Sequence, residues 1–185
     1  MTWPIRTTRT VYENRWVRVV EDEVVRPDGG IGIYGVVEMA HPAVFVVAMT
    51  DDDEVLLVTV DRHTVGPSIE VPAGGSDGED PLVAAQRELA EETGYEASEW
   101  REIGRMSALN GLARAPEHVF LATGLRRPGA DGETDASHET RLEEGISAVS
   151  SVPWAEAMRM VREGEIGDGE SVAALFYAAL ALGRV

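Results

Sequence analysis

The chain has 185 residues, no cysteine, and 33 acidic against 16 basic residues, which gives a formal net charge of −17 at pH 7. The absence of cysteine excludes disulfides, thiol nucleophiles and thiolate metal sites. The acidic excess argues against a nucleic-acid groove, which needs a basic stripe. An anionic substrate would be repelled at long range unless metal ions or local arginines reverse the field. No apolar run approaches the length of a membrane span, so we predict a soluble cytoplasmic protein with no membrane partner.

The first forty residues predict an arm followed by a β-hairpin. Residues 1–10 show no clear period and are interpreted as a loose arm. Alternating apolar residues favour strands at 16–26 and 31–38, and the Pro-Asp-Gly-Gly run between them is a strong turn signal. Because an exposed hairpin is only marginally stable alone, this one must pack on something.

The rest of the chain predicts one α+β domain with a mixed sheet and helices on its faces. Two continuous apolar runs, 43–49 and 55–60, are typical of strands buried on both faces. A short strand is expected at 69–71, and residues 107–117 and 128–145 are expected to be long loops. Further strands are predicted at 100–106, 118–121 and 146–152, and further helices at 153–161 and 171–182.

The most informative stretch is a short helix between Asp80 and Gly94. Asp80 suits the N-cap, the following Pro81 suits the first helical position, and Gly94 suits the left-handed residue that ends a helix. Apolar residues at helical spacing predict the buried stripe, which would consist of Leu82, Ala85 and Leu89.

Carboxylates crowd the C-terminal end of this helix. At roughly 100° per residue, Glu88, Glu91 and Glu92 fall within an arc of about 100° on one face. The helix dipole is already partly negative there, so the like charges repel each other, although Arg87 can pair with Glu91. A hard divalent cation would remove the conflict, because Mg²⁺ is held by carboxylates and substrate phosphates. The alternative is a solvated acidic helix face.

The spacing of the charged residues favours the metal site. This stretch resembles the signature of the Nudix hydrolase family. The matching run is Glu79, seven residues, Arg87-Glu88-Leu89, one residue, Glu91-Glu92, one residue and Gly94-Tyr95. One position departs: the family has Gly six residues before Glu79, where this chain has Ala73, so the loop is one residue shorter. The resemblance implies a Nudix-type α/β/α sandwich with a mixed central sheet and an N-terminal antiparallel β-hairpin.

Within this family the chain looks most similar to the ADP-ribose pyrophosphatase group. The likeness rests on the Arg-Pro-Asp-Gly hairpin, on residues 70–74, and on the run from Pro153 to the terminal helix. In that group the N-terminal hairpin packs against a second subunit. The resemblance therefore implies a homodimer, with residues 1–40 as the arm and hairpin of the dimer contact and residues 41–185 as the Nudix domain.

The resemblance also implies a reaction, which is metal-dependent hydrolysis of the pyrophosphate bond of ADP-ribose or a related nucleotide sugar. The products would be a nucleoside monophosphate and a sugar phosphate. The residues that would hold Mg²⁺ (or Mn²⁺) are Glu88, Glu91, Glu92, Ala73 and Glu79. Glu88 and Glu92 are also assigned as catalytic, together with Arg87, which would orient the carboxylates, and Glu144, the expected general base, for which Glu143 is the alternative.

The substrate contacts are expected to be Arg62, Glu70 and Arg114. Residues 109–111 read Leu-Asn-Gly where ADP-ribose enzymes usually have Ser-Pro-Gly, and Arg114 stands where some relatives have acidic groups. It could contact a phosphate, or it could be an exposed loop cation. A nucleoside-triphosphate or dinucleotide pyrophosphatase and a non-catalytic nucleotide-sugar-binding module therefore stay as alternatives. An acidic scaffold would explain the charge but not the spacing.

Overall fold

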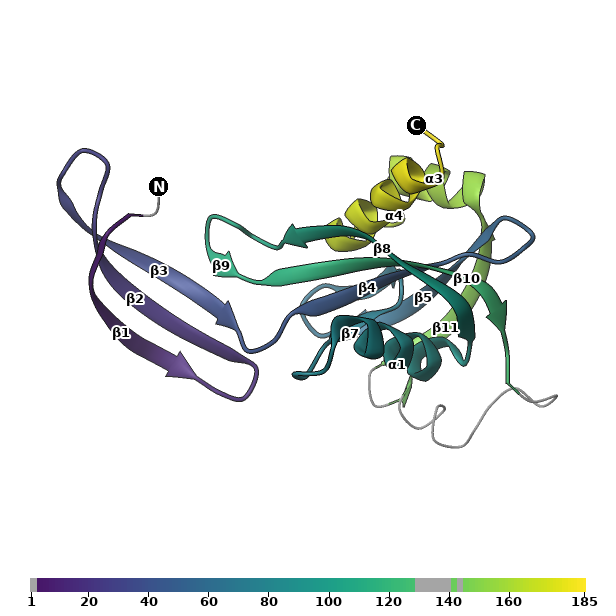
Figure 1. The fold of residues 1–185 in the computed structure, drawn as a ribbon, viewed down its shortest axis with the longest axis horizontal. Coiled ribbons are helices and arrows are strands. Elements are labelled where there is room, and N and C mark those ends of the chain that lie inside the picture. The colour runs from purple at the N-terminus through teal and green to yellow at the C-terminus, as the bar shows by residue number, and fades with distance from the viewer. Residues whose placement is uncertain (1–2, 129–140, 143–144) are drawn as a thin grey trace.

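The computed structural model describes residues 3–128, 141–142 and 145–185. The chain begins with a three-stranded antiparallel sheet of β1 (Ile5–Glu13), β2 (Val17–Val25) and β3 (Ile31–Met39). This N-terminal sheet projects to one side of the remaining elements (Figure 1). The expected hairpin is present as β2 and β3, and its turn contains Gly29 with a φ of +83°.

The prediction of a loose arm at residues 1–10 was wrong, because most of that segment lies in β1. Every residue of β1 is exposed, so the strand has no buried face to give it a hydrophobic period. Polar pairs across the sheet hold it instead. Arg6 lies 3.0 Å from Glu23, and Thr8 donates a hydrogen bond of 2.6 Å to Asp22.

Two sheets form the body of the molecule. In the mixed sheet, β4 (Ala43–Ala48) lies between β7 (Ala73–Gly75) and β10 (Pro116–Arg126), is parallel to β10 and is antiparallel to β7. The outer neighbour of β10 is the antiparallel β8 (Glu96–Ser107). In the second sheet, β5 (Glu54–Arg62) lies between the antiparallel β6 (Gly66–Glu70) and β11 (Ile146–Pro153).

Helices cover both sides of these sheets (Figure 1). The helix α1 (Pro81–Thr93) lies on one side, and α3 (Trp154–Glu163) and α4 (Gly169–Ala181) lie on the other. The predicted α+β sandwich with a mixed sheet is therefore confirmed. No helix in the described part of the chain is long and apolar enough to cross a membrane.

The central strands contribute to a separate apolar core on each face. In β4, Val44 and Val46 belong to the core that includes the buried residues of α1, whereas Phe45 and Val47 belong to the core that includes α3 and α4. The same alternation occurs in β5 and β10, because successive side chains of a strand point to opposite faces. This confirms that the apolar runs at 43–49 and 55–60 are strands buried on both faces.

The ends of α1 confirm the predicted caps, but its buried face differs from the prediction. The Asp80 side chain accepts a hydrogen bond of 3.0 Å from the N–H of Leu82, and Gly94 ends the helix with a φ of +75°. Leu82 is 36% exposed, so its place in the buried stripe was wrong. The helix is rotated so that two of its carboxylates turn inward, and its buried residues are Ala84, Ala85, Glu88, Leu89, Glu92 and Thr93.

The predicted loop at 107–117 contains a further short strand. Its two residues, Ala113 and Arg114, form β9 and pair in parallel with β3 of the N-terminal sheet. The connection between β8 and β10 is thus attached to the N-terminal sheet.

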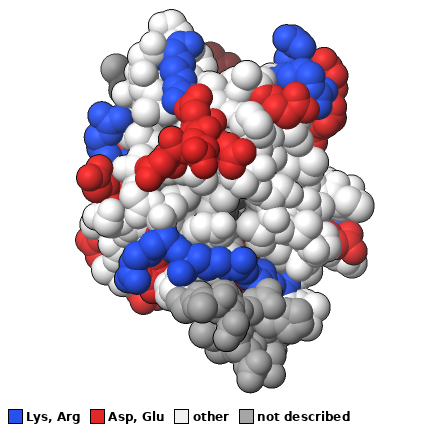
Figure 2. All heavy atoms as spheres, turned by 90° about the vertical axis from the view of Figure 1, so that its right-hand side faces the viewer, with Lys and Arg blue, Asp and Glu red and all other residues white. Residues whose placement is uncertain are grey.

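Charged side chains are grouped on the face drawn in Figure 2. An acidic patch lies above the middle, with basic side chains next to it at the top, and a band of basic side chains runs below it. The net charge of −17 is therefore not spread evenly over this face.

Candidate active site

The carboxylate end of α1 packs directly against β7. The N–H of Ala73 donates a hydrogen bond of 2.9 Å to Oε2 of Glu92. Glu88 and Glu92 are only 5% and 4% exposed. A Cβ atom on Gly74 would lie 2.2 Å from Oε1 of Glu88, so any larger residue would push this buried carboxylate out of its position. Gly74, which follows the Ala73 that stands at the signature's glycine position, therefore allows the close contact between the Glu88 carboxylate and β7.

Arg87 joins several of the site's carboxylates. Its Nε donates a hydrogen bond of 3.0 Å to Glu79, and its Nη1 donates to Glu88 at 2.8 Å and to Glu91 at 3.0 Å. Its Nη2 donates to the carbonyl of Gly75 at 3.0 Å. Burial opposes the charge of the guanidinium, but these partners prevail and raise the pKa of Arg87 above its ordinary value. Arg87 thus acts as an internal cation that holds the carboxylates together.

The donor atoms of this site suit a hard divalent ion. They are the carboxylate oxygens of Glu79, Glu88, Glu91 and Glu92, and Mg²⁺ and Mn²⁺ prefer oxygen ligands. As the side chains stand, the described residues include no group of three or more His, Asp or Glu placed to hold a metal ion. Since Arg87 contacts Glu79, Glu88 and Glu91, metal binding at these carboxylates would compete with an existing ion-pair network.

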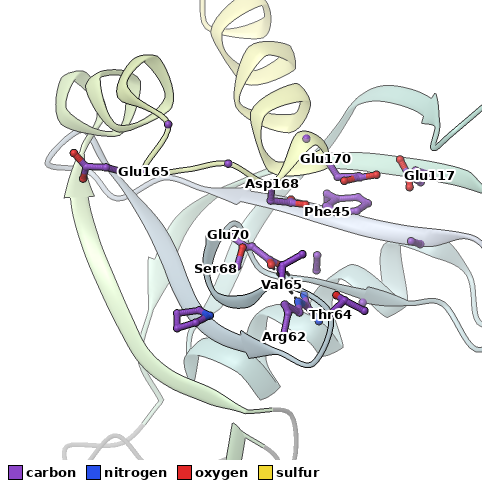
Figure 3. Close-up of a pocket in the computed structure, with 17 residues that line it drawn as sticks. Phe45, Arg62, Thr64, Val65, Ser68, Glu70, Glu117, Glu165, Asp168 and Glu170 are labelled. Atoms are coloured by element: carbon purple, nitrogen blue, oxygen red, sulfur yellow. Dashed lines mark hydrogen bonds and ion pairs between the residues drawn. The ribbon is translucent and has the colours of Figure 1, made fainter.

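A cavity of about 670 Å³ opens beside this end of the helix (Figure 3). Ala73 and Gly74 line it together with Arg62 and Glu70. Arg62 donates two hydrogen bonds to the buried Glu70, from Nε at 3.1 Å and from Nη2 at 2.5 Å. The hydrogen bonding with Glu70 raises the pKa of Arg62. The structure thus brings the predicted substrate residues Arg62 and Glu70 to the same cavity as Ala73.

Four further acidic residues line this cavity and were missed from the sequence: Glu117, Glu165, Asp168 and Glu170. Burial, followed by the charges of Glu170 and Asp168, raises the pKa of Glu117 to about 7. Burial also raises the pKa of Glu170, as does its hydrogen bond with Asp168. The only signal in the sequence was the pattern of Asp168 ahead of Ser171, which marks a helix N-cap and says nothing about a cavity.

Arg114 lies in a different place from the other predicted substrate residues. It forms ion pairs with Glu38 and, at 3.7 Å, with Asp22 of the N-terminal sheet. It lines a second cavity, of about 480 Å³, with Trp3 and Tyr34 among the other lining residues. The two cavities share no lining residue. The predicted bases Glu143 and Glu144 lie outside the described residues.

Comparison with known proteins places this site in a family. Residues 39–175 match the sequence model of the NUDIX domain. This chain belongs to the Nudix family. Ahead of the Nudix domain, residues 3–37 match the nucleoside diphosphate sugar hydrolase N-terminal domain.

Curated relatives of this Nudix protein span most of the chain. It is 36% identical over 170 residues to an ADP-ribose pyrophosphatase of Mycobacterium tuberculosis, which covers 90% of this chain and 78% of the relative. It is 31% identical to an ADP-ribose pyrophosphatase of Bacillus subtilis, over 92% of this chain and 89% of the relative. A GDP-mannose pyrophosphatase of Escherichia coli is 32% identical over 64% of this chain and 59% of the relative.

A solved structure shares the fold of the Nudix protein described here. The crystal structure of an ADP compounds hydrolase superposes with a TM-score of 0.80 at 22% identity, over 100% of this chain and 98% of that chain. Together these matches confirm the prediction of a Nudix hydrolase. Nudix hydrolases generally use divalent metal ions, which agrees with the oxygen donors at α1.

Proposed function

We propose that this Nudix hydrolase cleaves the pyrophosphate bond of a nucleotide sugar, with ADP-ribose or a close analogue as the substrate. The supporting observation is the packing of the α1 carboxylates against β7, beside a cavity that also contains Arg62. Relatives named as ADP-ribose and GDP-mannose pyrophosphatases support a nucleoside diphosphate linked to a sugar. The products would be a nucleoside monophosphate and a sugar phosphate.

The proposed metal is Mg²⁺, with Mn²⁺ as a substitute. Its ligands would be the carboxylates of Glu88, Glu91 and Glu92, with Glu79 and the backbone of Ala73 completing the set. When bound, such an ion supplies charge neutralisation of the diphosphate and an activated water.

The chain's own groups would bind and orient the substrate. Arg62 lines the cavity and would contact a phosphate, and its bidentate pair with the buried Glu70 fixes its direction. Arg87 keeps the carboxylates from repelling each other. Glu144, with Glu143 as the alternative, remains the predicted acceptor of the water's proton. Arg114 remains a predicted substrate contact.

A homodimer formed through the N-terminal sheet is part of this proposal. The sheet exposes apolar side chains that a single chain leaves uncovered: Ile5, Val11, Tyr12, Ile31, Ile33 and Met39. Several large apolar side chains exposed on one small sheet support an interaction site there. A cytoplasmic location also remains a prediction.

The direct test is hydrolysis of a panel of ADP-ribose, ADP-glucose, GDP-mannose, ATP and diadenosine tetraphosphate, with Mg²⁺ or with EDTA. We expect release of AMP from ADP-ribose only with Mg²⁺. Glu92→Gln should lower kcat by at least about 100-fold, since it removes a charge that the metal needs. The matched control is Glu99→Gln, an exposed glutamate of β8, which should keep the wild-type rate.

The outcomes separate the alternatives. Activity that survives EDTA or Glu92→Gln would overturn the metal mechanism. Cleavage of ATP or diadenosine tetraphosphate in preference to ADP-ribose would favour a triphosphate or dinucleotide pyrophosphatase. Tight binding of ADP-ribose without any product would favour a binding module.

A further inference from the structure

Acidic side chains form one end of the cavity beside the α1 carboxylates. Glu117 comes from the start of β10, and Asp168 and Glu170 come from the N-terminal end of α4 (Figure 3). All three line the same cavity as Arg62, Glu70 and Gly74. We call Glu117, Asp168 and Glu170 the acidic end of the cavity.

One oxygen at the acidic end is buried without a partner. Glu117 is 6% exposed, and its Oε2 has no hydrogen-bond partner in the structure. A buried acceptor that lacks a donor raises the free energy of the folded state. Glu117 forms part of the cavity wall, so a turn of its carboxyl group would present this oxygen to a donor on a bound ligand.

The negative charge at the acidic end is not balanced by the cavity itself. Among the described residues that line the cavity, Arg62 is the only cation, and it is already paired with Glu70. Glu165 also lines the cavity, but its carboxylate pairs with Arg159 at 2.6 Å.

The carboxyls of the acidic end also face one another. The Glu170 carboxyl shares a hydrogen bond with Asp168 and is repelled electrostatically by the charge of Glu70. Burial and this crowding raise the pKa of Glu117 and of Glu170, in agreement with the lack of a cation beside them among the described residues that line the cavity.

The ligand group that suits this end is a protonated amine. An ammonium group has positive charge and three donors, whereas a hydroxyl offers a donor but no charge, and a phosphate would be repelled. A metal ion is the other cationic ligand for this end, and Ca²⁺ binding is included in the test below. Nucleobases are uncharged at neutral pH, so the amine must belong to the group that the diphosphate joins to the nucleoside.

We propose that Glu117, Asp168 and Glu170 form a subsite for a protonated amine on the sugar or other group X of the nucleoside diphosphate. The proposal rests on the proposed function and adds to it a preference for a group X that carries an amine over its hydroxyl counterpart. The diphosphate would lie towards Gly74 and the α1 carboxylates, and the amine of X would lie towards α4.

The test compares matched pairs of compounds that differ by one amine. The pairs are ADP-glucosamine with ADP-glucose, and UDP-glucosamine with UDP-glucose, at pH 7 with Mg²⁺. For the wild type we expect kcat/KM to favour the amine by at least about tenfold within the preferred pair, which corresponds to ~1.4 kcal/mol. Both Glu117→Gln and Glu170→Gln should bring this ratio close to one. The control is Glu165→Gln, which removes a cavity carboxylate that already has a partner and should keep the ratio of the wild type.

The same pairs also separate this proposal from the proposed function. Equal rates for amine and hydroxyl would overturn the subsite and leave the pyrophosphatase function standing. A fall in the ratio with Glu165→Gln as large as with Glu170→Gln would also overturn it, because any lost charge would then suffice. If neither these compounds nor ADP-ribose is hydrolysed, the proposed function fails, and calorimetric binding of the same pairs still decides the subsite. If the wild type binds Ca²⁺ and shows no preference for the amine, and if Glu170→Gln abolishes the Ca²⁺ binding, the acidic end would be a metal site instead.

Discussion

Glu117→Gln should stabilise the protein, and more so at high pH than at low pH. The folded state raises the pKa of this carboxyl from its ordinary 4.5 to about 7, so the folded protein holds the proton more tightly than the unfolded chain. The wild type therefore loses stability as the pH rises from 4.5 through 7, whereas glutamine has no charge to bury. A shift from 4.5 to about 7 corresponds to about 3 kcal/mol at full ionisation, since each pKa unit is ~1.4 kcal/mol.

The gain can be measured by urea unfolding, followed by tryptophan fluorescence at pH 5 and pH 8 in EDTA at one protein concentration. The free energy of unfolding of Glu117→Gln should exceed that of the wild type by less than about 1 kcal/mol at pH 5 and by about 3 kcal/mol at pH 8. Glu165→Gln is the control. The pairing with Arg159 lowers the pKa of Glu165, so its effect should not change between these two pH values. Parallel pH profiles for Glu117→Gln and the wild type would refute the claim that this carboxyl is buried without a counter-charge.

Three further predictions concern the carboxylate helix and the N-terminal sheet. Arg87→Gln should lower the free energy of unfolding by about 2 kcal/mol in EDTA, because charged hydrogen bonds to the carboxylates are lost. Mg²⁺ should restore most of this stability by taking the place of the guanidinium. An equal loss of stability with Mg²⁺ would show that no ion does so. Gly74→Ala should reduce kcat by more than about tenfold, because the added Cβ would push the Glu88 carboxylate away. Gly75→Ala is the control and should stay active, because its Cβ would lie at an ordinary 3.5 Å from Asp77. Equal rates for the two variants would contradict the close packing of Gly74 against Glu88. The side chain of Ile33 is 66% exposed in the single chain, and Ile33→Glu should yield a folded monomer in analytical sedimentation. The control, Leu180→Glu on α4, should leave the oligomeric state unchanged. A monomeric wild type would refute the dimer.

Local chemistry made the carboxylate helix predictable. Its start and end depend on Asp80, Pro81 and Gly94, which act within a few residues of the helix. The two-sided burial of β4 was also predictable, since a continuous apolar run leaves no polar face. The rotation of α1 about its axis was not predictable, because it depends on the packing of Glu88 against Gly74 in β7.

Features that depend on distant partners escaped prediction. The strand β1 has no apolar period, and it is held by pairs such as Arg6 with Glu23 across the sheet. The acidic end of the cavity forms only when α4 brings Asp168 and Glu170 beside Glu117, more than 50 positions earlier in the chain. In the sequence, Glu117 was only the last residue of a predicted loop.

The short strand β9 gives the N-terminal sheet a mechanical connection to the substrate cavity. Arg114 pairs with Glu38 of β3, and Glu117 follows only three residues later. Three residues span at most about 10 Å, so the two points cannot move far apart. In the proposed dimer, a displacement of the N-terminal sheet on docking would therefore act on the segment that carries the Glu117 carboxyl. Assembly and the shape of the cavity would in this way be mechanically coupled.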